Sequence, residues 1–248
     1  MIKKTDIVYN EHNQLLDVFI PDNGDIKAVF VFFHGGGIEV GSKVESNNFV
    51  SYLTDRGIAV VSANYRMYPE SHFPDFLEDA ADAVAWVYKN KSEFQGCEKI
   101  FVGGSSAGGY ISMMLCFDKR YLEKNNIKPT DISGYIHDSG QPTSHFNVLK
   151  YSGVDPRRVI IDDRAPLYFV GIDKCYSPMI FIVADNDMKN RYEQTMLMLS
   201  ALKTFEYDES LIKFKLMHGK HCEHCKAKDE NGDSVFGKVI YNFISEFV

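Results

Sequence analysis

The sequence predicts an α/β fold in which a mostly parallel β-sheet is covered by helices on both faces. Apolar runs of strand length alternate with amphipathic segments of helix length along most of the 248 residues. Runs such as Ala28–Phe33 are apolar at every position instead of every second one, which is typical of strands buried on both faces. Glycine-rich turns follow two of these runs. Together these features indicate a parallel sheet between two layers of helices.

The expected strands are short apolar runs bounded by turn-forming residues, and the first two should pair as an antiparallel edge. They are Ile7–Tyr9, Leu15–Ile20, Ala28–Phe33, Ile58–Ala63, Lys99–Val102, Gly134–Ile136, Met179–Val183 and Ile212–Leu216. The expected helices carry apolar residues at helical spacing. They lie near Lys43–Arg56, at Asp75–Asn90 and Ala107–Cys116, around Tyr192–Leu202 and at Phe236–Phe247.

Length and composition favour one domain over residues 1–248. A chain of this length with 45% hydrophobic residues can build one large core and is short for two. Between Gly134 and Pro178 the chain is too long for a tight loop and too irregular for one helix. We expect residues 134–178 to contain a small lid or pocket insertion over the functional site.

The formal net charge of −7, with acids and bases interspersed, argues against a nucleic-acid or anionic-membrane partner. We therefore expect a small neutral or cationic ligand. No apolar run approaches the roughly 20 residues of a membrane span, and no signal peptide is recognisable, so a cytoplasmic location is expected. The five cysteines are an odd number without regular spacing, which fits reduced thiols. A homodimer is left open.

The segment Gly104-Ser105-Ser106-Ala107-Gly108 lies where an apolar strand must turn sharply into a helix. This is the pattern of a nucleophile elbow, which presents a serine hydroxyl at the start of a helix. Glycines two residues before and after Ser106 allow the tight turn because they carry no Cβ atom. A phosphate-binding loop is the alternative, but the spacing matches neither a P-loop nor a dinucleotide fingerprint. Ser106 is therefore the predicted nucleophile.

A second glycine motif, His34-Gly35-Gly36-Gly37, directly follows the strand Ala28–Phe33. Glycines leave backbone N–H groups accessible, and such groups can stabilise the negative charge that develops on a carbonyl oxygen under attack. We predict an oxyanion hole formed by the N–H groups of Gly36, Gly37 and Ala107.

With these motifs the chain resembles an α/β-hydrolase of the hormone-sensitive-lipase-like branch, a group of carboxylesterases and related acyl hydrolases. The resemblance rests on His34–Gly37, on Asn64–Glu70 followed by Phe73-Pro74, and on Gly104–Gly109. It implies an α/β-hydrolase fold and lipase-like serine esterase activity. The chain departs from the branch at Ser105, where an acid is common, and in an N-terminus too short for a helical cap. Both departures weaken any inference about the substrate.

The α/β-hydrolase fold implies that the catalytic acid and histidine follow the serine in that order, each after a strand. The loop Ala184–Met188 is similar to the acid loop of the family, and this match assigns the acid to Asp187, with Asp185 as the alternative. A carboxylate is needed there to orient the imidazole and to stabilise its charged form.

Three histidines follow the last expected strand. The family histidine comes shortly after a glycine, and Gly219-Lys220-His221 fits that pattern best. His224 is the next candidate, although it would need a longer loop. His218 lies too close to the strand end.

The histidine segment also contains Cys222-x-x-Cys225, which is half of a structural zinc pattern. Because no second pair of ligands is recognisable elsewhere, we expect no metal and no cofactor. Whether the Cys222/Cys225 cluster binds a metal stays open.

The leading functional prediction is a serine hydrolase that cleaves a small-molecule ester, of short chain or modest polarity, through an acyl-enzyme. An amide or formamide hydrolase of the kynurenine-formamidase kind would use the same groups and is the first alternative. A non-enzymatic metal- or ligand-binding module on the same fold is the second, and it would be expected to lack at least one of the catalytic residue types.

Overall fold

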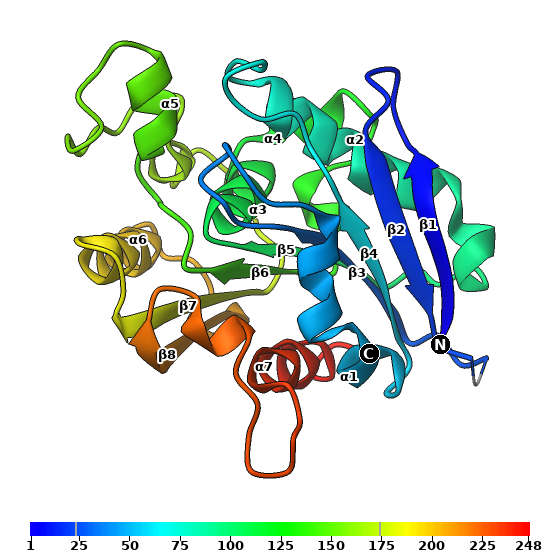
Figure 1. Ribbon diagram of the computed structural model, residues 1–248. Helices are drawn as coiled ribbons and strands as arrows, with labels where there is room; N and C mark the ends of the chain where they lie inside the picture. Colours follow the sequence, from blue (N-terminus) through cyan, green and yellow to red (C-terminus); the bar gives the residue numbers. More distant parts are fainter. Residues whose placement is uncertain (23, 174) are drawn as a thin grey trace.

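The computed structural model describes residues 1–22, 24–173 and 175–248. In this part of the chain, eight strands form one sheet in the order β1-β2-β4-β3-β5-β6-β7-β8 (Figure 1). The strands are β1 (Ile2–Val8), β2 (Leu15–Ile20), β3 (Ala28–Phe33), β4 (Ile58–Ala63), β5 (Ile100–Ser105), β6 (Gly134–Asp138), β7 (Met179–Asn186) and β8 (Ile212–Lys220). The expected fold class, a mostly parallel α/β-hydrolase sheet, is confirmed.

The α-helices connect these strands or follow them. They are α1 (Val50–Thr54), α2 (Asp75–Lys89), α3 (Ala107–Phe117), α4 (Lys119–Glu123), α5 (Phe146–Tyr151), α6 (Arg191–Thr204) and α7 (Val235–Ile244). Short 3₁₀ helices occur as well, and the one at Lys43–Asn48 precedes α1. None of the described helices combines the length and the apolar character that crossing a membrane requires.

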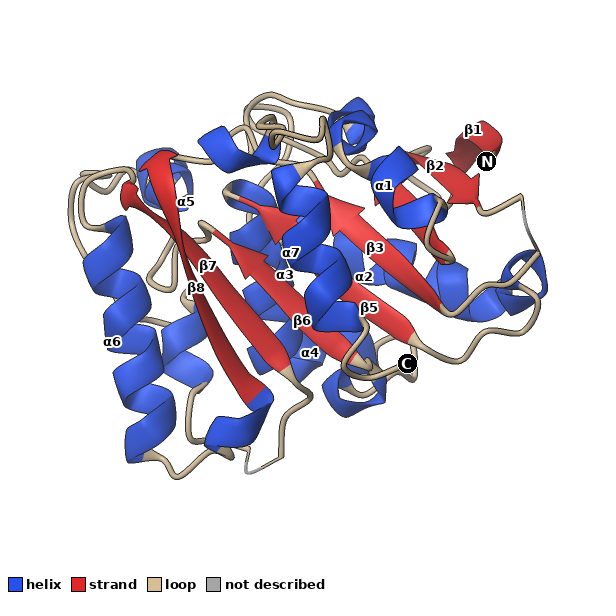
Figure 2. Cartoon of the chain, turned by 90° about the horizontal axis from the view of Figure 1, so that it is seen from below, coloured by secondary structure: helices blue, strands red, loops and turns tan. Residues whose placement is uncertain are grey.

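Two hydrophobic cores lie on opposite faces of the sheet. Along β3, Val29, Val31 and Phe33 contribute to the core under α2, α3 and α6, while Phe30 and Phe32 contribute to the core under α1 and α7. Figure 2 shows α7 crossing one face of the sheet and α3 behind it. Side chains alternate between the faces of a strand, so burial on both faces requires the continuous apolar runs seen in the sequence.

The antiparallel edge is also confirmed. Strands β1 and β2 pair antiparallel, β2 pairs antiparallel with β4, and the remaining neighbours are parallel. The carboxyl ends of β3, β5, β6, β7 and β8 therefore meet at one edge of the sheet. The loops that carry the predicted site residues all leave from this edge.

Some expected elements have other bounds in the structure, and the first strand already begins at Ile2. The helix expected near Lys43–Arg56 is divided into the 3₁₀ helix and α1, and at the break the amide of Asn48 donates to the backbone carbonyl of Glu45. Asparagine side chains compete in this way with helical hydrogen bonds. The last strand continues to Lys220 instead of ending at Leu216, because β7 continues to Asn186 and pairs with it there.

Candidate active site

Ser106 occupies the turn between β5 and α3 with φ 56° and ψ −111°, a backbone conformation that few residues other than glycine adopt. Its N–H donates to the backbone carbonyl of Asp138 at 2.8 Å, and its own carbonyl accepts from Tyr110 at 3.0 Å. These bonds hold the strained turn against β6 and α3. Strain of this kind often marks a functional position.

The two glycines that flank Ser106 allow the turn to approach the end of β3. A Cβ atom at Gly108 would lie 1.9 Å from the carbonyl oxygen of Phe33, and one at Gly104 would lie 2.5 Å from the same oxygen. Both contacts are too short for any side chain. The glycine pattern of the elbow therefore reflects close packing against β3 as well as turn geometry.

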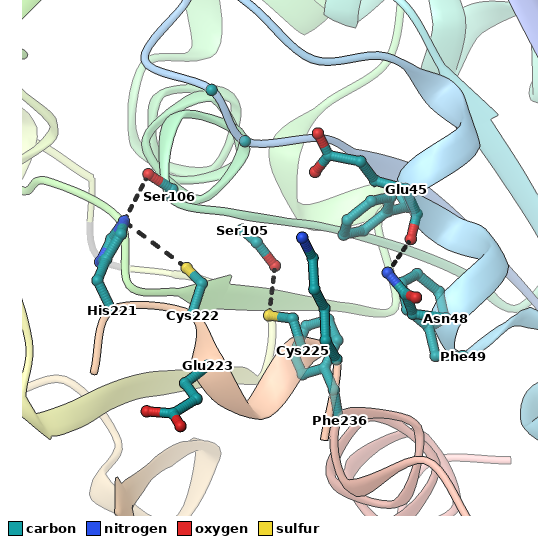
Figure 3. Close-up of a pocket in the computed structure, with 14 residues that line it drawn as sticks. Glu45, Asn48, Phe49, Ser105, Ser106, His221, Cys222, Glu223, Cys225 and Phe236 are labelled. Carbon is teal, nitrogen blue, oxygen red and sulfur yellow. Dashed lines mark hydrogen bonds between the residues drawn. The ribbon is translucent and has the colours of Figure 1, made fainter. Parts of the chain in front are cut away.

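His221 lies between the predicted nucleophile and an aspartate. The Ser106 hydroxyl donates to Nε2 of His221 at 2.8 Å, and Nδ1 of His221 donates to Oδ1 of Asp187 at 2.5 Å (Figure 3 shows the first contact). The Asp187 side chain is only 1% exposed. Its other oxygen accepts from the Ser139 hydroxyl at 3.0 Å. The structure thus brings together the three residues predicted from the sequence.

The alternative residues form pairs of their own. Asp185 accepts from His218 at 2.6 Å, but that histidine side chain is 93% exposed and lies on β8. His224 is buried and donates to Asp138 at 2.8 Å. In the described part of the chain, neither His218 nor His224 forms a hydrogen bond with Ser106.

The contacts between His221 and Asp187 explain the pKa values of both side chains. Burial opposes ionisation of Asp187, but hydrogen bonds from His221 and from two backbone N–H groups outweigh it and hold its pKa below the usual range. Burial also disfavours a charged His221, yet Asp187 and Cys222 raise its pKa above the ordinary value. Such an imidazole can accept a proton from a hydroxyl only once it has lost its own, which occurs toward alkaline pH.

The glycine loop after β3 lies against the elbow. Gly36 and Gly37 have φ values of +101° and +67°, and a Cβ atom at Gly36 would lie 1.9 Å from the carbonyl oxygen of Val40. The hydrogen bonds found among the described residues leave the N–H groups of Gly36 and Gly37 unused. Ala107 is the first residue of α3, where an N–H has no partner within the helix.

The loop is held from outside by Asn147 of α5. Its amide donates to the carbonyl of Gly37 at 2.6 Å and to Glu39 at 2.9 Å. Nothing in the local sequence pattern links Asn147 to a loop 110 residues earlier, so this contact could not be predicted.

A cavity of about 420 Å³ opens beside Ser106. Its walls come from the glycine loop, the 3₁₀ helix before α1, the elbow and the segment after β8 (Figure 3). The residues that line it include Gly36, Glu45, Phe49, Cys222 and Phe236. None of the described residues 139–178 lines this cavity, so the role of that segment as a lid or substrate pocket stays a prediction.

A buried polar cluster lies behind His221. Asp138 accepts from His224 at 2.8 Å and from the Cys225 thiol at 3.2 Å. One ligand atom from each of Asp138, His224 and Cys225 lies within 4.8 Å of the others, so these residues are the ones that could hold a metal ion. Because the donors already satisfy the carboxylate, the cluster needs no metal, and the expectation of none stays a prediction.

Asp138 was also missed in the sequence analysis. It connects the elbow, through its carbonyl, with the histidine segment, through its carboxylate. Its position could have marked it as a site residue, because it is polar and follows a predicted strand next to the elbow strand.

Comparisons with known proteins identify the fold family. A family model described as alpha/beta hydrolase fold matches residues 30–158. A probable isoprenylcysteine α-carbonyl methylesterase from Arabidopsis thaliana is 35% identical over 120 residues, which cover 47% of this chain and 28% of that protein. The carboxylic ester hydrolase LipN of Mycobacterium tuberculosis is 36% identical over 120 residues, covering 47% of this chain and 32% of that protein. The matched regions thus span less than a third of either relative.

Solved esterases share the fold over nearly the whole chain. The esterase Est2 of Thermogutta terrifontis superimposes with a TM-score of 0.77 at 19% identity and covers 98% of this chain and 93% of that one. A hyperthermophilic esterase from Pyrobaculum calidifontis gives a TM-score of 0.77 at 20% identity, with coverage of 99% and 86%. At this identity the likeness establishes the fold alone.

Proposed function

The chain belongs to the α/β-hydrolase fold family, in its hormone-sensitive-lipase-like branch, and on this premise we propose that it is a serine carboxylesterase. The observation that carries the proposal is the position of His221, which contacts both Ser106 and Asp187. Relatives with carboxylic ester hydrolase activity in their names are consistent with it.

In the proposed reaction the Ser106 hydroxyl attacks the ester carbonyl while His221 accepts its proton. Asp187 holds the imidazole in the tautomer that leaves Nε2 free to accept, and it stabilises the imidazolium that forms. The N–H groups of Gly36, Gly37 and Ala107 donate to the oxyanion of the tetrahedral intermediate. His221 then protonates the leaving alcohol, and water hydrolyses the acyl-enzyme by the same route in reverse.

The cavity beside Ser106 supports a small-molecule ester as the substrate. Its volume of about 420 Å³ lies near the lower end of the range of ligand sites. The cavity wall mixes apolar side chains such as Phe49 and Phe236 with polar ones such as Glu45 and Asn48. A short ester of modest polarity would fit this lining.

The test combines labelling with turnover. We expect a fluorophosphonate to modify Ser106, located by mass spectrometry, and short 4-nitrophenyl esters to be hydrolysed. Ser106→Ala should lose both. Ser105→Ala is the matched control, because Ser105 is only 5% exposed and its hydroxyl contacts the Cys225 sulfur at 3.5 Å instead of a histidine.

Ser105→Ala should therefore retain labelling and most of the rate. An unlabelled Ser106, or turnover that survives in Ser106→Ala, would contradict the proposal. Arylformamides in the same panel test the amide-cleaving alternative. A protein that binds these compounds without cleaving any of them would be a non-enzymatic module.

A further inference from the structure

A second cavity, of about 440 Å³, lies next to the loops of the candidate active site. It is lined by Met188, which follows Asp187, and by Phe146 of α5. A Cβ atom at Gly37 would lie 3.6 Å from the Phe146 ring, so the cavity also adjoins the glycine loop. Helices α5 and α6 stand at the same side of the molecule (Figure 1).

The charged side chains that line this cavity are all basic. Arg157, Arg158, Lys189 and Arg191 line it, and no acidic side chain is among its described lining residues. Arg157 pairs with Asp155 at 2.6 Å, and the other three cations have no ion pair among the described residues. This concentration of positive charge stands out in a chain with a formal net charge of −7. We refer to these four residues and the cavity they line as the basic pocket.

Arg191 is the unusual member of the basic pocket. It is only 4% exposed, and its Nη1 has no hydrogen-bond partner among the described residues. Partly buried arginines elsewhere in the protein pair with an aspartate: Arg66 with Asp79 at 2.8 Å and Arg164 with Asp162 at 2.5 Å. Burying an unpaired charge is costly, so the most buried arginine would be expected to have the best partner.

Asp187, the acid whose charge acts on Arg191, forms no ion pair with it among the described residues. Asp187 acts on Arg191 through its charge, but burial dominates and lowers the pKa of Arg191 to about 10, which leaves it positive at neutral pH. One oxygen of Asp187 already accepts from His221 and from the N–H of Met188. The other accepts from Ser139 and from the N–H of Ala184. The positive charge of Arg191 is therefore left for a group that enters the cavity.

We propose that the basic pocket binds the carboxylate of an acidic ester substrate, with Arg191 as its buried anchor. A planar guanidinium can donate two parallel hydrogen bonds to a carboxylate, which gives both affinity and orientation. Arg158 and Lys189 at the exposed rim would attract the anion. Monoesters of dicarboxylic acids and esters of hydroxy acids are the substrate classes that fit.

The substrate class rests on the proposed esterase function, and it differs from the neutral or cationic ligand expected from the net charge. Net charge describes the whole surface, whereas binding depends on the few charges that line the cavity.

The kinetic test uses pairs of esters that differ in one charge. On the acyl side, 4-nitrophenyl hemisuccinate is compared with 4-nitrophenyl levulinate, in which a methyl ketone replaces the carboxylate. On the alcohol side, 4-acetoxybenzoate is compared with 4-acetoxyacetophenone. We expect kcat/KM to favour the anionic member of one pair by about 10- to 100-fold, the range for hydrogen bonds to charged groups.

Arg191→Met should abolish this preference, because it keeps an unbranched side chain that fills most of the buried stem and removes the charge. Lys203→Met is the matched control: it makes the same charge change on the same helix, at a side chain 72% exposed. It should keep the preference.

A binding measurement separates the pocket from the reaction. Free succinate should raise the melting temperature of the wild type, whereas its neutral diamide should not, and Arg191→Met should lose the succinate effect. Without anion, Arg191→Met should melt at or above the wild-type temperature, because an apolar side chain replaces an unpaired buried charge.

Three results would overturn the inference. Equal loss of kcat/KM for both members of a pair in Arg191→Met would mean that Arg191 only supports Asp187. Absence of any anionic preference together with hydrolysis of the neutral esters would refute the substrate class and leave the esterase proposal intact. Failure of succinate to stabilise the wild type would refute the pocket itself, even if Arg191→Met failed to fold.

Discussion

Acid should destabilise this protein in part through His34, which lies at the start of the glycine loop. The side chain is fully buried, its Nδ1 donates to the carbonyl of Gly35 at 2.7 Å, and its ring stacks on Tyr65 with centroids 4.4 Å apart. Its Nε2 is buried without a partner among the described residues. A proton on that nitrogen would be an unpaired buried charge, and burial accordingly lowers the pKa of His34 to about 4.

The direction of the effect follows from comparing the two states. In the unfolded chain His34 takes up a proton near its ordinary pKa of 6.5, whereas in the folded protein it does so only near 4. As the pH falls through this window, the unfolded chain is protonated first, and stability is lost between about pH 6.5 and pH 4. The difference in pKa corresponds to about 3 kcal/mol.

The measurement is urea unfolding at a series of pH values, followed by the fluorescence of Trp86, the single tryptophan. Carboxylates with lowered pKa values, such as Asp187, also lose stability in acid, so a variant must isolate the histidine. His34→Asn removes the titration but keeps a donor near the position of Nδ1. The free energy of unfolding of this variant should fall by about 3 kcal/mol less than that of the wild type over the window.

The exposed His12 provides the control, since His12→Asn should follow the wild-type curve. Parallel curves for His34→Asn and the wild type would refute the reasoning, because they would mean that His34 titrates alike in both states.

Three further predictions concern the elbow, the histidine and the glycine loop. Gly108→Ala should fail to accumulate as folded protein in an expression and circular-dichroism assay, whereas Gly153→Asn, with no atom within 4 Å of an added Cβ, should fold normally. His221→Ala should lower kcat by about 10³ or more while the exposed His218→Ala retains most of it, and the reverse result would move the proposed base to His218. Asn147→Leu should lower kcat by about 10- to 100-fold through a misplaced glycine loop, and an unchanged kcat would show that the loop holds its position alone.

The sequence alone determined the architecture because its signals are local. Strands buried on both faces need continuous apolar runs, and the boundaries of β3 and β4 could be read directly from Ala28–Phe33 and Ile58–Ala63. The elbow could also be predicted, since a sharp turn from strand to helix requires glycines at fixed positions around Ser106. At Asn48 the side chain competes with the helical hydrogen bonds of the backbone, and the predicted bounds of the helix near Lys43–Arg56 were wrong.

Tertiary structure decided which of several similar residues meet. Asp185 and Asp187 are two aspartates only two positions apart. Only Asp187 contacts His221, while Asp185 contacts the exposed His218. The contacts of Asp138 with the histidine segment and of Asn147 with the glycine loop join positions more than 80 residues apart. No local pattern encodes such pairs.

The clearest case is Arg191. In the sequence it is one basic residue at the start of a helix, and the net charge suggested a ligand of the opposite kind. Whether a charge is solvated, paired or left unpaired depends on which atoms surround it after folding, and these come from segments distant in the chain. Packing buries Arg191 beside an aspartate whose oxygens are already occupied, and only the folded chain could reveal that its charge lacks a partner.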